Sequence, residues 1–288
     1  MLEERSFNTG VVEISYVEGP PSGPPLVLLH GFTGRWQHFL PVIPALYARW
    51  HFYAPDCRGH GKSGRVPGQY MPKDYMEDAA AFVQHVVSEP AVLFAHSLGG
   101  VSAVWVAGQM PDKVRAVIIG DTPLSNAGWA ALPDTQQFHT ALRGIIASGR
   151  PVRELVPLLA DVTAPGEEPP TRFGDLPDVD GVVLREWART LEQLDPDVVQ
   201  LLAEGRKQEF RANFDMDAMV SKVSCPVLLL QGNTSLGGIM TDEDVEHVLS
   251  TLPEAYCVKI DHAGHDLGLS TWQVAPLLTA LTNFLESL

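Results

Sequence analysis

Short runs of apolar residues, most of them bounded by glycine, proline or aspartate, recur along the chain and predict buried β-strands. Six such runs span residues 25–30, 51–56, 91–96, 114–121, 226–231 and 255–261. Amphipathic stretches separate them, and residues 73–88 carry apolar side chains at the spacing that lines one face of a helix. This alternation predicts a mostly parallel sheet with helices on both faces.

Two regions depart from that alternation. Residues 6–9 and 11–16 predict an antiparallel hairpin at the edge of the sheet, which brings the expected number of strands to about eight. Residues 122–223 contain no convincing strand, only helical pieces and, at 161–180, a loop rich in proline, glycine and acidic residues. We therefore expect a core formed by residues 1–121 and 224–288, with residues 122–223 as a helical cap over one end of the sheet.

Composition narrows the class of protein. Hydrophobic residues make up 45% of the 288 positions, enough for a sizeable core. Twenty Lys and Arg face 35 Asp and Glu, and this charge of −15 argues against nucleic acid and anionic membrane surfaces as partners. The three cysteines, Cys57, Cys225 and Cys257, match no metal or disulfide pattern. Without an apolar leader or an apolar run long enough for a membrane span, a cytoplasmic protein is expected.

The strongest chemical signal is the sequence AHSLGG at residues 95–100. It follows a predicted strand directly and leads into a helical run, which is the context of a nucleophile elbow. Small residues two before and two after Ser97 let strand and helix approach each other. Ser97 would then lie at a helix N-terminus, where the backbone N–H of Leu98 is available to an oxyanion.

A second oxyanion donor is expected from the loop HGFTG at residues 30–34, which follows an earlier strand. Gly31 permits a tight turn there, and the backbone N–H of Phe32 is the predicted donor. His30, at the strand end, is expected to pack or hydrogen-bond behind this loop and to take no catalytic role.

A serine nucleophile needs a base, and His265 is the predicted one among ten histidines. It lies after the last predicted strand, the place of the base in the chain order Ser, Asp, His. Gly264 indicates a tight loop at that point. His262 is the competing candidate, but it lies closer to the strand.

Taken together, HGFTG, the segment DCRGHGKSG at residues 56–64, AHSLGG and GHD resemble the α/β-hydrolase superfamily in order and spacing over nearly the whole chain. The resemblance implies a mostly parallel, about eight-stranded α/β sheet with a helical cap inserted after the sixth strand. The segment at 56–64 is expected to brace the fold.

Members of that superfamily usually supply the third residue, an acid, from the loop after the seventh strand, but residues 231–238 contain no carboxylate and Ser235 stands at the expected place. Some members, including haloalkane dehalogenases and certain lactonases, carry the acid at the end of the sixth strand. Asp121, 24 positions after Ser97, is therefore the predicted acid, and Asp242 is the alternative.

The resemblance implies a serine hydrolase that cleaves a hydrophobic ester or lactone through an acyl-enzyme on Ser97, without metal or organic cofactor. Serine in place of an aspartate nucleophile argues against epoxide hydrolase and dehalogenase chemistry. Hydrolysis of C–C bonds in ring-cleavage products, perhydrolysis and a noncatalytic receptor remain alternatives, and the oligomeric state is open. The substrate pocket is expected to be apolar, and its predicted lining is Gly31, Trp36, Trp129 and Trp187.

Overall fold

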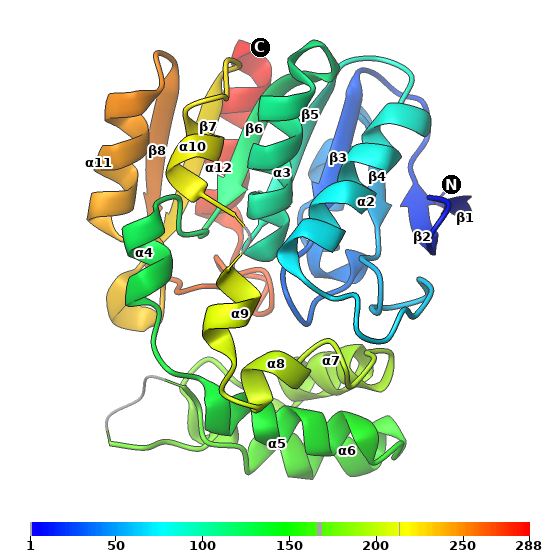
Figure 1. The fold of residues 1–288 in the computed structure, drawn as a ribbon, viewed down its shortest axis with the longest axis vertical. Coiled ribbons are helices and arrows are strands. Elements are labelled where there is room, and N and C mark those ends of the chain that lie inside the picture. The colour runs from blue at the N-terminus through cyan, green and yellow to red at the C-terminus, as the bar shows by residue number, and fades with distance from the viewer. Residues whose placement is uncertain (1, 166–168, 213) are drawn as a thin grey trace.

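The computed structural model describes residues 2–165, 169–212 and 214–288. Its strands are β1 (Glu3–Asn8), β2 (Glu13–Glu18), β3 (Pro25–Leu29), β4 (His51–Pro55), β5 (Ala91–His96), β6 (Val114–Gly120), β7 (Val227–Gly232) and β8 (Ala255–Ile260). They form one eight-stranded sheet in the order β1-β2-β4-β3-β5-β6-β7-β8 (Figure 1). The pairs from β4 to β8 are parallel, whereas β2 pairs antiparallel with both β1 and β4. The predicted α/β architecture and the hairpin at its edge are confirmed.

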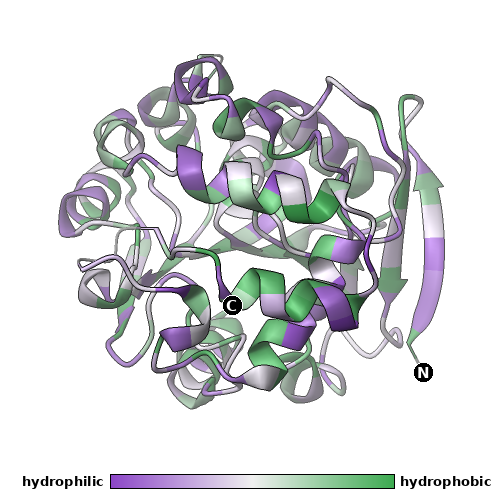
Figure 2. Ribbon diagram, turned by 90° about the horizontal axis from the view of Figure 1, so that it is seen from below, coloured by the Kyte–Doolittle hydropathy of each residue, from purple (hydrophilic) through white to green (hydrophobic). Residues whose placement is uncertain are grey.

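The burial of each strand agrees with its place in the sheet. The central strands β3, β5 and β7 are buried at every position, as continuous apolar runs predict for a sheet covered on both faces. β1 is largely exposed, and its polar residues appear as a mostly hydrophilic ribbon beside the N-terminus in Figure 2. Polar side chains on an edge strand discourage pairing with another chain.

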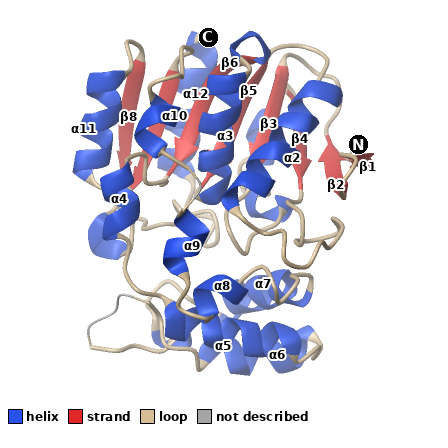
Figure 3. Ribbon diagram, viewed as in Figure 1, coloured by secondary structure: helices blue, strands red, loops and turns tan. Residues whose placement is uncertain are grey.

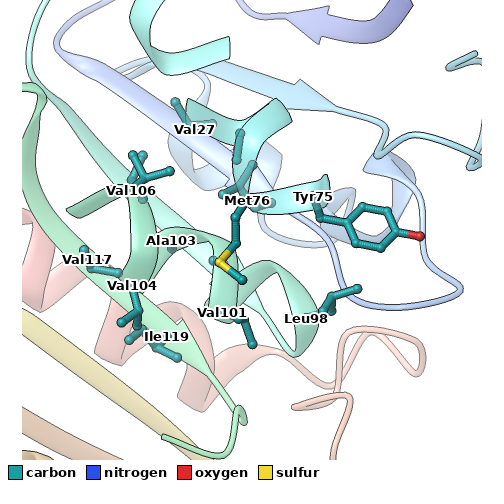
Figure 4. Close-up of a cluster of buried hydrophobic side chains, with 14 of the residues drawn as sticks. Val27, Tyr75, Met76, Leu98, Val101, Ala103, Val104, Val106, Val117 and Ile119 are labelled. Atoms are coloured by element: carbon teal, nitrogen blue, oxygen red, sulfur yellow. The ribbon is translucent and has the colours of Figure 1, made fainter. Parts of the chain in front are cut away.

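Helices cover the two faces of the sheet. One hydrophobic cluster joins side chains of α2 (Pro72–His85), α3 (Leu98–Gln109) and α11 (Asp242–Thr251) to alternate strand residues such as Val27, and Figure 4 shows part of it. The opposite cluster joins α1 (Ile43–Leu46) and α12 (Ala275–Ser287) to the intervening strand residues, Leu26 and Leu28 among them. The alternation of strand side chains thus divides the core into two layers.

The chain between β6 and β7 is helical. It carries α4 (Asn126–Ala131), α5 (Gln136–Ala147), α6 (Val152–Ala160), α7 (Gly181–Glu192), α8 (Gln200–Ala203), α9 (Lys207–Arg211) and α10 (Met216–Val220). Figures 1 and 3 show α5 to α8 as a layer beyond the carboxyl ends of the parallel strands, with α9 between that layer and α3, and α10 packs on α3 itself. The helical insertion after the sixth strand is confirmed, whereas the division into two domains at 121 and 223 stays a prediction.

The predicted loop at 161–180 contains a bridge between Thr163 and Arg172 and a short 3-10 helix, Phe173–Asp175. Residues 166–168 of this loop lie outside the described residues. Within the described ranges, none of the helices combines the length and the apolar character that a bilayer crossing requires.

Candidate active site

Ser97 occupies a sharp turn between β5 and α3. Its backbone has φ 54 and ψ −124, a left-handed conformation that is rare for a residue with a side chain. Two glycines make the turn possible: a Cβ at Gly99 would lie 2.3 Å from the carbonyl oxygen of Leu29, and one at Gly100 would lie 2.2 Å from Thr122 Oγ1. The strand, strained turn and helix expected of a nucleophile elbow are therefore present.

His265 lies in the loop after β8, with its ring beside Ser97. Its Nε2 is 3.0 Å from Ser97 Oγ, so the hydroxyl can donate a hydrogen bond to the ring. The loop is tight, as predicted, because a Cβ at Gly264 would lie 1.8 Å from the carbonyl oxygen of Leu236. The competing His262 points elsewhere and hydrogen-bonds the carbonyl of Gln273.

Asp121 follows β6 and completes a chain of hydrogen bonds. Its Oδ2 is 2.7 Å from His265 Nδ1, and its side chain has no exposed surface. The carboxylate also accepts backbone N–H groups from Gly232, Ile239 and Met240 at 2.8–3.2 Å. Burial alone would raise the pKa of Asp121, but the hydrogen bond and charge of His265, together with the amides of Ile239 and Gly232, lower it below its ordinary value.

Asp242, the alternative acid, lies apart from this chain. Its side chain is 74% exposed, accepts a hydrogen bond from Gln231 at 2.7 Å and pairs with Lys259 at 3.7 Å. The Gln231 bond and the Lys259 charge lower its pKa. The structure thus brings Ser97, His265 and Asp121 together and leaves Asp242 at the surface.

The loop expected to bind an oxyanion lies against the serine. A Cβ at Gly31 would be 2.8 Å from Ser97 Cβ, so only glycine lets this backbone approach so closely. In the part of the chain that the structure describes, the N–H of Phe32 donates to no protein group. Leu98 is the first residue of α3, directly after Ser97. Leu98 thus lies at the positive end of a helix and Phe32 follows the glycine that abuts Ser97, whereas their role as oxyanion donors stays a prediction.

His30 is fixed behind this loop. Its Nε2 accepts the N–H of Cys57 at 2.9 Å, so its Nδ1 carries the proton and donates to the carbonyl of Gly31 at 2.8 Å. Burial lowers its pKa, which keeps the ring neutral. His30 hence supports the backbone of the oxyanion loop without reaching the site.

Residues 56–64 brace the same region. Asp56 accepts the backbone N–H groups of Trp36 and Lys62 at 2.8 and 3.0 Å. Arg58 forms a two-pronged ion pair with Asp78 at 2.6 and 2.7 Å. These contacts fix the segment 56–64 to the residue Trp36, which follows the oxyanion loop, and to α2. The sequence predicted such a bracing role for this segment.

His96 is a residue that the sequence reasoning passed over. Its Nε2 lies 2.6 Å from the carbonyl oxygen of His265, so Nε2–H donates to the backbone that carries the candidate base. Burial, followed by the charge of His265, lowers the pKa of His96 to about 4 and keeps it neutral. Its ring stacks on His38 with centroids 5.0 Å apart. Its position, one residue before Ser97, was the available signal.

The predicted pocket residues lie in different surroundings. Trp129 packs edge-on against Phe214 and borders a cavity of about 160 Å³ that Asn126, Gln208 and Arg211 also line. In the helical segment, Trp187 packs on Phe173 and Phe138, with centroids 4.4 and 6.0 Å away.

Trp36 is partly buried against the hydrophobic cluster of α1 and α12. That these three tryptophans line a substrate pocket stays a prediction.

No group of three or more potential metal ligands occurs among the residues that the structure describes. The side chain of His265 is 36% exposed, so solvent and small molecules can reach the candidate base. Chemically, the arrangement offers a nucleophilic hydroxyl, a base oriented by a buried carboxylate, and backbone amides for a developing negative charge.

Comparison with known proteins identifies the family. Residues 24–270 match the family model of the alpha/beta hydrolase fold. A 2-(acetamidomethylene)succinate hydrolase of Mesorhizobium japonicum is 36% identical over 100 residues, which cover 35% of this chain and 36% of that protein. Epoxide hydrolase A of Mycobacterium tuberculosis is 26% identical over 99% of this chain and 98% of its own. The first two curated relatives are matched over less than half of their own length.

Solved structures show the same fold. The crystal structure of an E-2-(acetamidomethylene)succinate hydrolase superposes with a TM-score of 0.74 at 22% identity, covering 99% of this chain and 100% of that one. A bromoperoxidase from Bacillus anthracis superposes with a TM-score of 0.76 at 18% identity, covering 99% and 100%. Because the family model matches residues 24–270, most of this chain, the chain belongs to the alpha/beta hydrolase family.

Proposed function

We propose that this member of a hydrolase family is a serine hydrolase that cleaves a carboxylic ester or lactone of a hydrophobic small molecule. The observation that carries the proposal is the continuous chain from Ser97 Oγ to His265 Nε2 at 3.0 Å and from His265 Nδ1 to Asp121 Oδ2 at 2.7 Å. Such a chain is what a serine needs to become a nucleophile at neutral pH.

In the proposed reaction, Ser97 attacks the carbonyl carbon while His265 takes its proton. Asp121 holds the ring in the tautomer with the proton on Nδ1 and stabilises its charged form. The N–H groups of Phe32 and Leu98 stabilise the oxyanion. The protonated ring then gives its proton to the leaving alcohol, and a water activated by the neutral ring releases the acid from Ser97.

The serine favours this chemistry over that of the relatives named epoxide hydrolase. An alkyl–enzyme ester requires a carboxylate nucleophile at the elbow, and this chain has Ser97 there. We accordingly infer acyl transfer, and we assign residues 122–223 the role of a cap over the site. We further propose a cytoplasmic location, and a reaction that needs no metal or organic cofactor.

The second candidate uses the same three residues on another bond. The match to a 2-(acetamidomethylene)succinate hydrolase covers about a third of this chain, so hydrolysis of an acid of that kind, or of a C–C bond, is the alternative. Turnover of such a compound, with p-nitrophenyl esters left intact, would favour it.

The test is hydrolysis of p-nitrophenyl esters from acetate to decanoate. The proposal predicts turnover by the wild type and a fall in kcat/KM of about 10³-fold or more in Ser97→Ala, because the nucleophile is removed. Ser88→Ala, an exposed serine after α2, serves as the matched control and should retain wild-type rates. Hydrolysis that survives in Ser97→Ala would overturn the assignment.

A further inference from the structure

His139 of α5 reaches the candidate oxyanion loop from the helical segment. Its ring centroid is 6.0 Å from that of Phe32, the residue whose N–H is the proposed oxyanion donor. Phe210 of α9 contacts the same ring at 5.7 Å. Two side chains of the helical segment therefore face the residue that would hold the scissile carbonyl.

The proton on the His139 ring has a defined place. Nδ1 lies 2.9 Å from the carbonyl oxygen of Thr135, which can only accept, so Nδ1 carries the hydrogen. The same carbonyl accepts the backbone N–H of His139 at 3.0 Å, which ties the ring to its own helix turn. Burial lowers the pKa of His139, so the neutral ring persists and Nε2 presents a lone pair.

That lone pair has no partner in the described part of the chain, although the residue is only 8% exposed. A neutral ring nitrogen without a hydrogen can accept a hydrogen bond from solvent or from a bound molecule. His96 Nδ1 and His38 Nε2 are also unpaired, but both are sealed from solvent, whereas His139 Nε2 is not among the sealed atoms. His139 Nε2 therefore keeps contact with solvent, although most of the ring is buried.

We propose that His139 Nε2 accepts a hydrogen bond from the substrate and selects carbonyl compounds that carry an N–H or O–H donor a short chain away from the scissile carbonyl. The inference rests on the proposed function, because it places that carbonyl at the Phe32 amide. Because the His139 ring packs beside the Phe32 ring, a donor on a substrate held at the Phe32 amide would come within reach of Nε2. His139 then binds substrate and takes no part in proton transfer.

The experiment compares two esters that differ in one donor, p-nitrophenyl N-acetylglycinate and its N-methyl analogue, p-nitrophenyl N-acetylsarcosinate. We expect the wild type to prefer the N–H ester in kcat/KM by about five- to tenfold, the effect of one neutral hydrogen bond. His139→Phe, which keeps an aromatic ring beside Phe32 but removes the acceptor, should reduce this ratio to about one. His85→Phe, at an exposed position of α2, is the matched control and should keep the wild-type ratio.

Each outcome decides the proposal. Loss of the preference in His139→Phe with its retention in His85→Phe supports it. A wild-type ratio near one, or a ratio that His139→Phe leaves unchanged, overturns the inference while Ser97-dependent hydrolysis still supports the proposed function. If neither ester is hydrolysed in a Ser97-dependent manner, both are overturned. Should His139→Phe fail to fold, His139→Leu provides the test, because leucine also removes the acceptor and should bring the ratio to about one.

Discussion

The loops that follow the neighbouring strands β6 and β7 contribute different groups to the candidate acid site. The β6 loop carries the carboxylate, Asp121, whereas the β7 loop, where such hydrolases usually carry it, has none. The end of β7 and the loop after it instead contribute the amides of Gly232, Ile239 and Met240, all of which bind that carboxylate. In the proposed triad the acid therefore lies on β6, and backbone donors from the end of β7 and its loop hold it there.

Glycines let the β7 loop take this form. A Cβ at Gly238 would lie 2.7 Å from the carbonyl group of Gly232, so the loop folds directly onto its own strand. Asn233 closes the turn by accepting the N–H of Ser235 through its side chain and that of Gly238 through its carbonyl. Ser235, which stands where the superfamily usually has the acid, thus lies in a tight turn.

The largest expected effect separates the two loops directly. Asp121→Asn should lower kcat for ester hydrolysis by about 10³- to 10⁴-fold, because the amide cannot stabilise the charged His265 ring or hold its tautomer. Asp242→Asn, at the exposed position beyond the β7 loop, should stay within about twofold of the wild type. Steady-state kinetics on one p-nitrophenyl ester measures both, and the reverse order would show that Asp242 is the acid.

A smaller effect is expected from the β7 backbone. Gly238→Ala forces the loop away from Gly232 and disturbs the amides that bind Asp121, so the free energy of unfolding should fall by about 2 kcal/mol. Gly144→Ala is the control, since it adds a methyl group in open space within α5 and should stabilise by up to about 1 kcal/mol. Urea unfolding gives both values. Equal stability of Gly238→Ala and wild type would mean that the loop does not need its close packing.

The smallest effect is expected in how the free energy of unfolding changes at low pH. The pKa of Asp121 in the folded protein lies below its ordinary value of 3.8, so its ionised form contributes stability above that pH, and the contribution is lost as the pH falls through the lower folded value. The difference in unfolding free energy between wild type and Asp121→Asn should therefore shrink between about pH 5 and pH 2. Urea titrations across this range test it; a difference that widens in acid would contradict the lowered pKa of Asp121.

The strands and their alternation with helices could be predicted from the sequence, because short continuous apolar runs bounded by glycine, proline or aspartate are typical of buried strands. The strands at 25–30 and 91–96 lie within a residue of their predicted ends, and Ser97 and His265 follow from their places after strands. The amides that support Asp121 were beyond prediction, since any residue can supply an N–H and only the turn of the loop directs it. His96 and His139 were missed for a similar reason: their importance depends on which atoms lie opposite their rings.

The insertion between β6 and β7 leaves and rejoins the core at almost one point. Asn126 donates from its backbone and side chain to Asp217 and from its side chain to Asp215, and its side-chain oxygen accepts the N–H of Met216. Asn126 therefore fastens the outgoing and returning chains to each other, and Trp129 and Phe214 add an aromatic contact between them. Because its two ends are held together and β6 and β7 are neighbouring strands, the length of the chain between residues 126 and 215 is not set by the distance between the strands that it connects.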